Sequence, residues 1–331
     1  MKKLLVKSEV PDLFVEPYIT SAYRKPFCGP LQCIKYAFTL HNDVGNFWTH
    51  FLTLVIWITW LLFVMQDYDL SSDYYGPLLW CWIGCCSYAF FSSFAHMFSP
   101  LSEVMYHVCF MLDYTGISMY MYGGGVAYYY YERPLTLTFY SWEGVNIGLQ
   151  VMVTMMALVF SCLSRFFWRR YRYTIRAMSF APPFFINITP VILRWFECQG
   201  EECVLSSLPY HAYATLFTFL TVLPFVTKMP ERLAPGKFDI FFQSHQLFHV
   251  SAAITTTSQM KLLLLDSRGR QEILTKNAQQ TGIFPSASKL YSLFFIIFAV
   301  KLCVVILLGV LLKMGIVKDN KRKDVKHPKS S

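Results

Sequence analysis

The sequence predicts an all-α protein whose helices cross a lipid bilayer several times. Of the 331 residues, 55% are apolar and only 15% are charged, whereas soluble domains carry about 25% charged residues. The mean hydropathy is +0.38, and apolar runs long enough to span a membrane recur along the chain. These observations exclude a disordered chain, a small disulfide-stapled domain and an ordinary soluble enzyme.

A helix that crosses the hydrocarbon core needs about 20 mostly apolar residues. The fifth run below is interrupted by Pro182, Pro183, Asn187 and Pro190, and the seventh by polar residues 243–246. Such interruptions are tolerated in lipid only if they face protein or a cavity. The eight predicted spans are 47–66, 77–98, 106–128, 143–164, 175–196, 210–228, 238–262 and 289–313.

Basic residues set the expected orientation, because Lys and Arg are enriched in cytoplasmic segments. With a cytoplasmic amino terminus, the inner segments hold 21 Lys and Arg and the outer segments hold 7. The net charge of +9 is therefore assigned to lipid head groups and orientation, not to nucleic acid. The expected organisation is a cytoplasmic segment over 1–46, a seven-helix core over 47–262, an exoplasmic loop over 263–288, an eighth spanning helix over 289–313 and a basic cytoplasmic tail over 314–331.

Ionisable groups inside spans are functional candidates, because burying them in lipid costs free energy. Four such residues are His96, Asp113, His245 and His249. The predicted topology places His96 at the inner end of the second span. It places the other three early in the third and seventh spans, on the same side of the membrane. Lys301 lies deep in the eighth span, and we expect it to snorkel or to pair with a carboxylate.

The spacing of His245 and His249 puts both imidazoles on one face of a helix, as in helices that supply two zinc ligands. A third ligand from His96 would leave one coordination position open. Asp113 is then a ligand, a partner of a ligand or a base for bound water, and Ser92 lies one turn before His96. The alternative is that these groups are polar contacts between helices. Three other histidines compete as ligands: His41, His50 and His107.

Cys198 and Cys203 lie in the loop that follows the fifth span, where an oxidising compartment would allow a disulfide. Two free thiols are an equally compatible interpretation.

Four separated motifs stand out along the chain: HNDVGNFWTH (41–50), SSFAH (92–96), FMLDYTGIS (110–118) and MPERLAPGKFDIFFQSHQLFHV (229–250). Together they resemble the motifs of the progestin and adiponectin receptor family. One position differs, because the family more often has Glu where this chain has Asp43. This departure lies in the first-span motif and touches no proposed ligand.

The resemblance implies a seven-helix core around an intramembrane Zn²⁺ near the cytoplasmic side. His96, His245 and His249 would bind the metal, and Asp113 and Ser92 would lie around its water. The eighth apolar run and the basic tail are most like the membrane progestin receptor branch. That branch binds steroids at the plasma membrane, and its members are described as signalling through G proteins.

These features suggest two alternative functions for the protein, one as a receptor and one as an enzyme. The first is a receptor for a steroid or a sphingolipid-like ligand. The second is a zinc-dependent hydrolase of lipid amides, because alkaline ceramidases share the same layout of Ser, His and Asp. A transporter is disfavoured because no inverted repeat is evident. A rhodopsin-like receptor is disfavoured because the amino terminus is expected in the cytoplasm.

Overall fold

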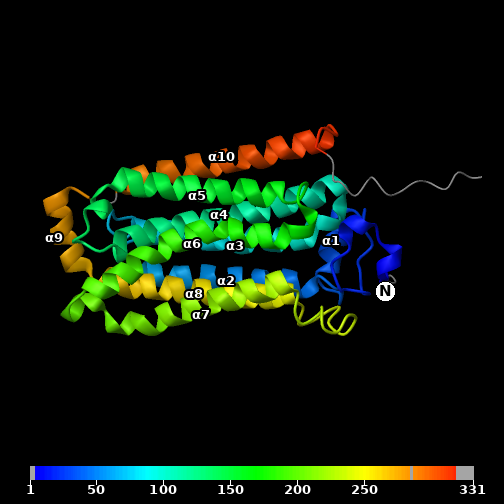
Figure 1. Ribbon diagram of the computed structural model, residues 1–331, viewed down its shortest axis with the longest axis horizontal. Coiled ribbons are helices and arrows are strands. Elements are labelled where there is room, and N and C mark those ends of the chain that lie inside the picture. Colours follow the sequence, from blue (N-terminus) through cyan, green and yellow to red (C-terminus); the bar gives the residue numbers. More distant parts are fainter. Residues whose placement is uncertain (1–3, 284–285, 318–331) are drawn as a thin grey trace, which may run out of the picture.

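Eight long helices in the described residues run along one axis and alternate in direction (Figure 1). The computed structural model describes residues 4–283 and 286–317. Within these ranges there is no β-strand, so the predicted all-α fold is confirmed. From residue 318 onward the expected tail over 314–331 lies outside the described residues. The long helices are α2 (Val44–Asp67), α3 (Gly76–Phe98), α4 (Glu103–Glu132), α5 (Glu143–Leu163), α6 (Arg172–Glu197), α7 (Leu208–Thr227), α8 (Ser244–Gly269) and α10 (Ala287–Lys313).

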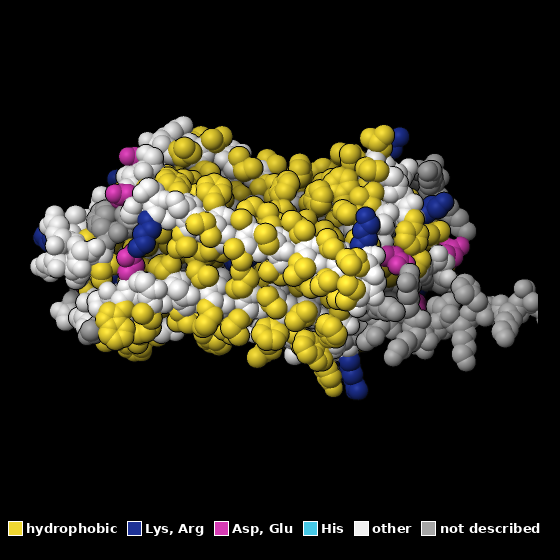
Figure 2. All heavy atoms as spheres, turned by 90° about the horizontal axis from the view of Figure 1, so that it is seen from above, with side chains coloured by type: hydrophobic (Ala, Val, Ile, Leu, Met, Phe, Trp, Pro, Cys, Tyr) yellow, Lys and Arg dark blue, Asp and Glu magenta, His cyan; other side chains and the backbone are white. Residues whose placement is uncertain are grey.

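The two ends of the bundle are built from different connections. The N-terminal segment, helix α1 (Pro30–Tyr36) and the connection between α7 and α8 lie at one end, which we call the amino-terminal end (Figure 1). Helix α9 (Gln271–Thr281) lies at the opposite end. Apolar side chains cover the middle of the face seen in Figure 2, and the charged side chains visible there lie towards both ends. This belt is typical of a protein that sits in a bilayer.

Six of the eight long helices are long and apolar enough to cross a membrane, and the two exceptions are α4 and α8. These two correspond to the predicted spans 106–128 and 238–262. Both lie alongside the other long helices. Helix α4 is surrounded by protein, because it packs against α3, α5, α6, α8 and α10. A helix that is surrounded by protein does not have to be apolar on every face. The chain is an integral membrane protein in which the polar helices are shielded by the apolar ones.

The seventh predicted span differs from the structure at both ends. Residues 238–243 form turns, and α8 begins at Ser244. The Glu231 carboxylate accepts hydrogen bonds from the backbone N–H and the hydroxyl of Ser244, which satisfies a free donor at the start of the helix. At its other end α8 continues to Gly269. The expected loop over 263–288 is therefore largely helical, because α9 follows directly.

Polar residues inside the spans are satisfied by neighbouring helices. Helix α6 remains helical through its three prolines. Its Asn187 side chain accepts a hydrogen bond from Gln150 (2.8 Å) and donates one to the carbonyl of Met121 (3.2 Å). The buried ammonium group of Lys301 donates to the carbonyl of Ser118 (3.2 Å) and to a threonine hydroxyl of α5 (3.3 Å). The expectation that Lys301 snorkels or pairs with a carboxylate is therefore wrong.

The N-terminal segment is held against the amino-terminal end of the bundle by charged contacts. Asp239, just before α8, accepts hydrogen bonds from Thr20 and Ser21. Arg24 forms an ion pair with Asp43 at 2.6 Å and also donates to a backbone carbonyl at the end of α3. The segment therefore reaches the first residues of α2, beside the histidines described next.

Candidate metal centre

Three histidines from two helices meet near the amino-terminal end of the bundle. His96 lies in the last turn of α3, and His245 and His249 lie in the first two turns of α8. One ring nitrogen of each histidine lies within 4.8 Å of the other two. The Nε2 atoms of His96 and His245 are 3.2 Å apart. The structure therefore brings together the three side chains that the sequence suggested as ligands, in a group that could hold a metal ion.

Neighbouring residues orient two of these imidazole rings. The Nδ1 atom of His96 lies 2.8 Å from a carboxylate oxygen of Asp43. The Nδ1 atom of His249 lies 3.0 Å from the hydroxyl of Thr49 and 3.2 Å from the carbonyl of Asn46. Because Nδ1 is engaged in both rings, Nε2 remains to face the other histidines. Metal-binding histidines are commonly oriented in this way.

Asp43 is the site residue that the sequence analysis missed. It was noted only as a departure from the motif and was given no part in the site. Burial raises the pKa of Asp43, but attraction to His96 and Arg24 outweighs this effect and leaves the pKa below its ordinary value. The carboxylate is therefore ionised at neutral pH and can accept the Nδ1 proton of His96. The available signal was an acidic residue directly before the first apolar run.

Asp113 and Ser92 lie beside the histidines and not among them. Among the described residues, the group whose nitrogens approach one another contains three histidines and no Asp113. The Asp113 carboxylate lies on α4 and the Ser92 hydroxyl lies on α3. Both residues line the same cavity as His96 and His245. Of the three roles considered for Asp113, this placement favours action on a water or ligand next to the histidines.

The three competing histidines differ in their contacts with the group of three. The His50 ring lies against His249, with ring centroids 3.8 Å apart, and its buried Nδ1 has no hydrogen-bond partner among the described residues. His41 accepts a hydrogen bond from the backbone N–H of Asp43. His107 lies within hydrogen-bond distance of an arginine at the end of α5. His50 is therefore the additional residue to consider at this site.

A cavity of about 650 Å³ extends from the histidines into the bundle. Its walls on α6 and α7 include the aromatic side chains of Phe184 and Phe219. On the far wall Tyr120 donates a hydrogen bond to Gln259. The volume lies within the roughly 300–1,000 Å³ range of sites for small molecules. Apolar walls with a few polar groups at one end suit an amphipathic ligand.

The haemolysin-III-related family matches residues 38–260, which is more than half of the chain and contains all three histidines. The chain belongs to this family. The predicted resemblance to progestin and adiponectin receptors is thereby confirmed.

The similarity of this chain to its relatives extends over most of its length. Membrane progestin receptor gamma-B of Danio rerio is 34% identical over 290 residues, which cover 82% of this chain and 84% of the relative. Membrane progestin receptor gamma of Homo sapiens is 34% identical over 280 residues, which cover 83% of this chain and 84% of the relative. Membrane progestin receptor delta of Mus musculus is 32% identical over 290 residues, covering 86% and 84%.

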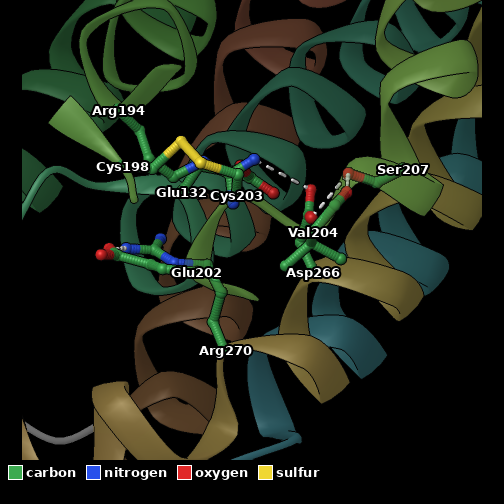
Figure 3. Close-up of a disulfide and its surroundings, with 9 residues drawn as sticks. All are labelled: Glu132, Arg194, Cys198, Glu202, Cys203, Val204, Ser207, Asp266 and Arg270. Atoms are coloured by element: carbon green, nitrogen blue, oxygen red, sulfur yellow. Dashed lines mark hydrogen bonds and ion pairs between the residues drawn. A yellow bond between two sulfur atoms is a disulfide. The ribbon is translucent and has the colours of Figure 1, made fainter. Parts of the chain in front are cut away.

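This haemolysin-III-related chain has a second buried polar cluster, at the opposite end of the bundle (Figure 3). One guanidinium nitrogen of Arg194 lies 3.1 Å from Glu132 and 3.4 Å from Asp266. Asp266 also accepts a hydrogen bond from Ser207 and contacts His211 at 2.9 Å. Two carboxylates and an imidazole could ligate a metal by their spacing. However, Arg194 already supplies the positive charge, so we interpret this cluster as a structural ion pair that joins α4, α6 and α8.

A disulfide between Cys198 and Cys203 lies beside this cluster (Figure 3). It closes the short loop after α6, which contains Glu202. The Glu202 carboxylate lies 2.9 Å from the buried guanidinium group of Arg270, at the end of α8. The loop therefore carries the partner of a buried cation.

We predict that Arg194→Met lowers the stability of the purified protein. The substitution leaves Glu132 and Asp266 buried without their cation, and breaking a buried ion pair costs about 3–5 kcal/mol. The midpoint of thermal unfolding in detergent should fall clearly below that of the wild type. Adding Glu132→Gln should recover part of the loss. The control Lys276→Met removes an exposed ion pair and should leave the midpoint nearly unchanged. Equal midpoints for Arg194→Met and the wild type would contradict this interpretation.

Proposed function

We propose that His96, His245 and His249 hold a zinc ion. Tetrahedral zinc with Zn–N bonds of 2.0–2.1 Å separates two ligand nitrogens by about 3.3 Å, close to the 3.2 Å between the Nε2 atoms of His96 and His245. Three protein ligands leave a fourth position for water or a ligand group. When bound, zinc would polarise a carbonyl oxygen and make a water more acidic. Asp113 and Ser92 would orient the group in that position.

We propose that the protein is a membrane receptor of the progestin and adiponectin receptor type. Its ligand would be a steroid such as a progestin, or another lipid, bound in the cavity between the histidines and the aromatic walls of α6 and α7. The cavity is the observation that carries this proposal. Similarity to proteins named membrane progestin receptors supports a steroid as the first ligand to test.

An intramembrane hydrolase of ceramide-like amides is the second candidate. It is favoured by the Asp113–Ser92 pair, which lines the same cavity as His96 and His245. In this role the Asp113 carboxylate would accept a proton from water, and the Ser92 hydroxyl would donate a hydrogen bond to the lipid carbonyl. The two functions are compatible, because one cavity would serve both.

We further propose that the amino-terminal end faces the cytoplasm and that the protein resides in the plasma membrane. The 21 basic residues assigned to this side support that orientation. A G protein would then contact the connections at this end. The loop between α5 and α6 offers exposed Phe167, Trp168, Arg170 and Tyr171 for such a contact.

For the zinc proposal, we predict that purified wild-type protein contains about one zinc per chain and that His96→Ala, His245→Ala and His249→Ala do not. Loss of zinc should also lower the thermal midpoint, because a bound metal stabilises the folded state. Asp43→Asn should weaken zinc affinity about 10–100-fold by releasing the His96 ring. His107→Gln serves as the control and should retain zinc. Metal content is measured by mass spectrometry, and full zinc in the three alanine variants would overturn the assignment.

For the orientation, we predict that reporter tags at both termini are accessible only from the cytoplasm. An even number of crossings between the termini requires them to share one side. The measurement is protease or antibody access in intact and permeabilised cells. A carboxyl terminus that is accessible in intact cells would show that the number of crossings is wrong.

For the cavity, we predict saturable binding of radiolabelled progesterone that Ala181→Phe weakens at least tenfold, because the added ring fills space on the α6 wall. Ile192→Phe places the same ring at an exposed position on α6, and this variant should bind normally. The receptor proposal fails if the wild type does not bind or if both variants bind alike. Fatty-acid release from ceramide by the same wild-type sample, abolished in His245→Ala and Asp113→Asn, would establish the hydrolase. Absence of release from zinc-loaded protein would exclude it.

A further inference from the structure

Three cations surround the ring of Tyr173 at the amino-terminal end of the cavity. The ammonium nitrogen of Lys228 lies 3.5 Å from the ring centroid. The guanidinium carbons of Arg172 and Arg176 lie 4.7 Å and 5.8 Å from it. All four side chains line the cavity. We call Arg172, Arg176 and Lys228 the basic cluster.

The basic cluster has no direct carboxylate partner. Among the described residues, no ion pair within 4.0 Å involves any of its three members. Glu16 is linked to the cluster through Tyr173, whose hydroxyl donates to Glu16 (3.0 Å) and accepts from Arg172 (2.7 Å). Glu231 also lies near Lys228, and its carboxylate accepts hydrogen bonds from Ser244 at the start of α8.

A fourth cation adds to the positive charge of this region. Arg165 is buried on the same cavity wall, and its donors are occupied by His107 and the Tyr114 hydroxyl. Nothing in these contacts neutralises its charge. The imbalance therefore extends beyond the three members of the basic cluster.

The basic cluster still has donors to offer. Arg176 uses its Nε atom to donate to Ser164 at 2.9 Å, and in the described residues neither of its terminal nitrogens has a protein hydrogen-bond partner. Arg172 donates from one terminal nitrogen only. In the part of the chain that the structure describes, the Lys228 ammonium group lies over two aromatic rings and makes no hydrogen bond. Several N–H groups on three side chains are therefore available to a ligand.

Orientation in the membrane does not account for this arrangement. Positive charge on the cytoplasmic side requires only that the residues face water there. Arg170, Arg232 and Lys237 meet that requirement with exposed side chains. In contrast, Lys228 is buried. Burial lowers its pKa to about 8 and outweighs the attraction of Glu16 and Glu231. Gathering like charges in a half-buried site costs free energy unless an anion joins them.

We propose that the basic cluster binds the phosphate group of a ligand whose apolar part occupies the cavity. The three cations and the one carboxylate linked to them, Glu16, leave the basic cluster with a net positive charge, and a phosphate monoester carries a charge of about −1.5 to −2. The guanidinium groups of the two arginines can each donate two hydrogen bonds to the oxygens of a phosphate. The inference rests on the proposed function, in which the cavity holds a lipid. The phosphate belongs either to a lipid head group or to free inorganic phosphate, and the experiment separates the two.

The test uses purified full-length protein in a neutral detergent. Binding is measured for oleoyl lysophosphatidate, for the monoacylglycerol with the same chain, and for inorganic phosphate. The cluster variant is Arg176→Gln/Lys228→Gln. The matched control, Arg232→Gln/Lys237→Gln, also removes two charges, but from exposed positions between α7 and α8. Zinc content confirms that each variant is folded, and Lys228→Gln alone replaces the double variant if that variant does not fold.

We expect the wild type and the control to bind the lipid phosphate at least tenfold more tightly than the monoacylglycerol, and the cluster variant to bind both equally. Cluster-dependent binding of inorganic phosphate with equal affinity would support the same site with free phosphate as its ligand. Equal affinity of the wild type for the charged and uncharged lipids, without phosphate binding, would overturn the proposal. So would equal losses in the cluster and control variants.

The proposed function is tested separately by progesterone. If progesterone binds but the charged and uncharged lipids bind with equal affinity and inorganic phosphate does not bind, the phosphate site is overturned and the receptor proposal stays intact. Cluster-dependent phosphate binding without progesterone binding would do the reverse.

Discussion

The burial of polar groups away from lipid is the constraint on which this structure depends. A polar side chain at membrane depth is stable only when it meets other protein groups or a cavity. Helices α4 and α8 carry many such groups and lie inside a layer of more apolar helices. The same constraint brings Asp113 and the three histidines to the inside of the bundle, where they line one cavity or border it.

The two ends of the bundle meet this constraint in opposite ways. At the end that carries the disulfide, Arg194 contacts both Glu132 and Asp266, and Glu202 pairs with Arg270. These groups form ion pairs with one another within the protein. At the amino-terminal end, imidazole nitrogens face one another, and the three cations of the basic cluster line a cavity without a direct carboxylate partner among the described residues. Polar groups left unmatched by the protein are the ones that suit a metal ion and a ligand.

The N-terminal segment contacts both the candidate metal centre and the basic cluster. Arg24 pairs with Asp43, and Asp43 in turn holds the ring of His96. Glu16, on the same segment, reaches the ring of Tyr173 at the basic cluster. A segment that precedes the first long helix therefore contributes to both proposed sites. It acts through hydrogen bonds and charge, and also through side chains that line the cavity.

The sequence alone determined the all-α class, most span positions and the choice of His96, His245 and His249. Hydrophobic run length and i, i+4 spacing are local properties, so they can be read without coordinates. Only the tertiary structure decided that Asp43 holds His96, that Lys301 pairs with no carboxylate among the described residues, and that three basic residues beside Tyr173 share a cavity. These facts depend on contacts between residues that are distant in the chain, and residue spacing does not encode them. The predicted start of the seventh span differs from the start of α8 for a related reason. Glu231 fixes the start of the helix from a turn, and a turn has no hydrophobic periodicity that the sequence could reveal.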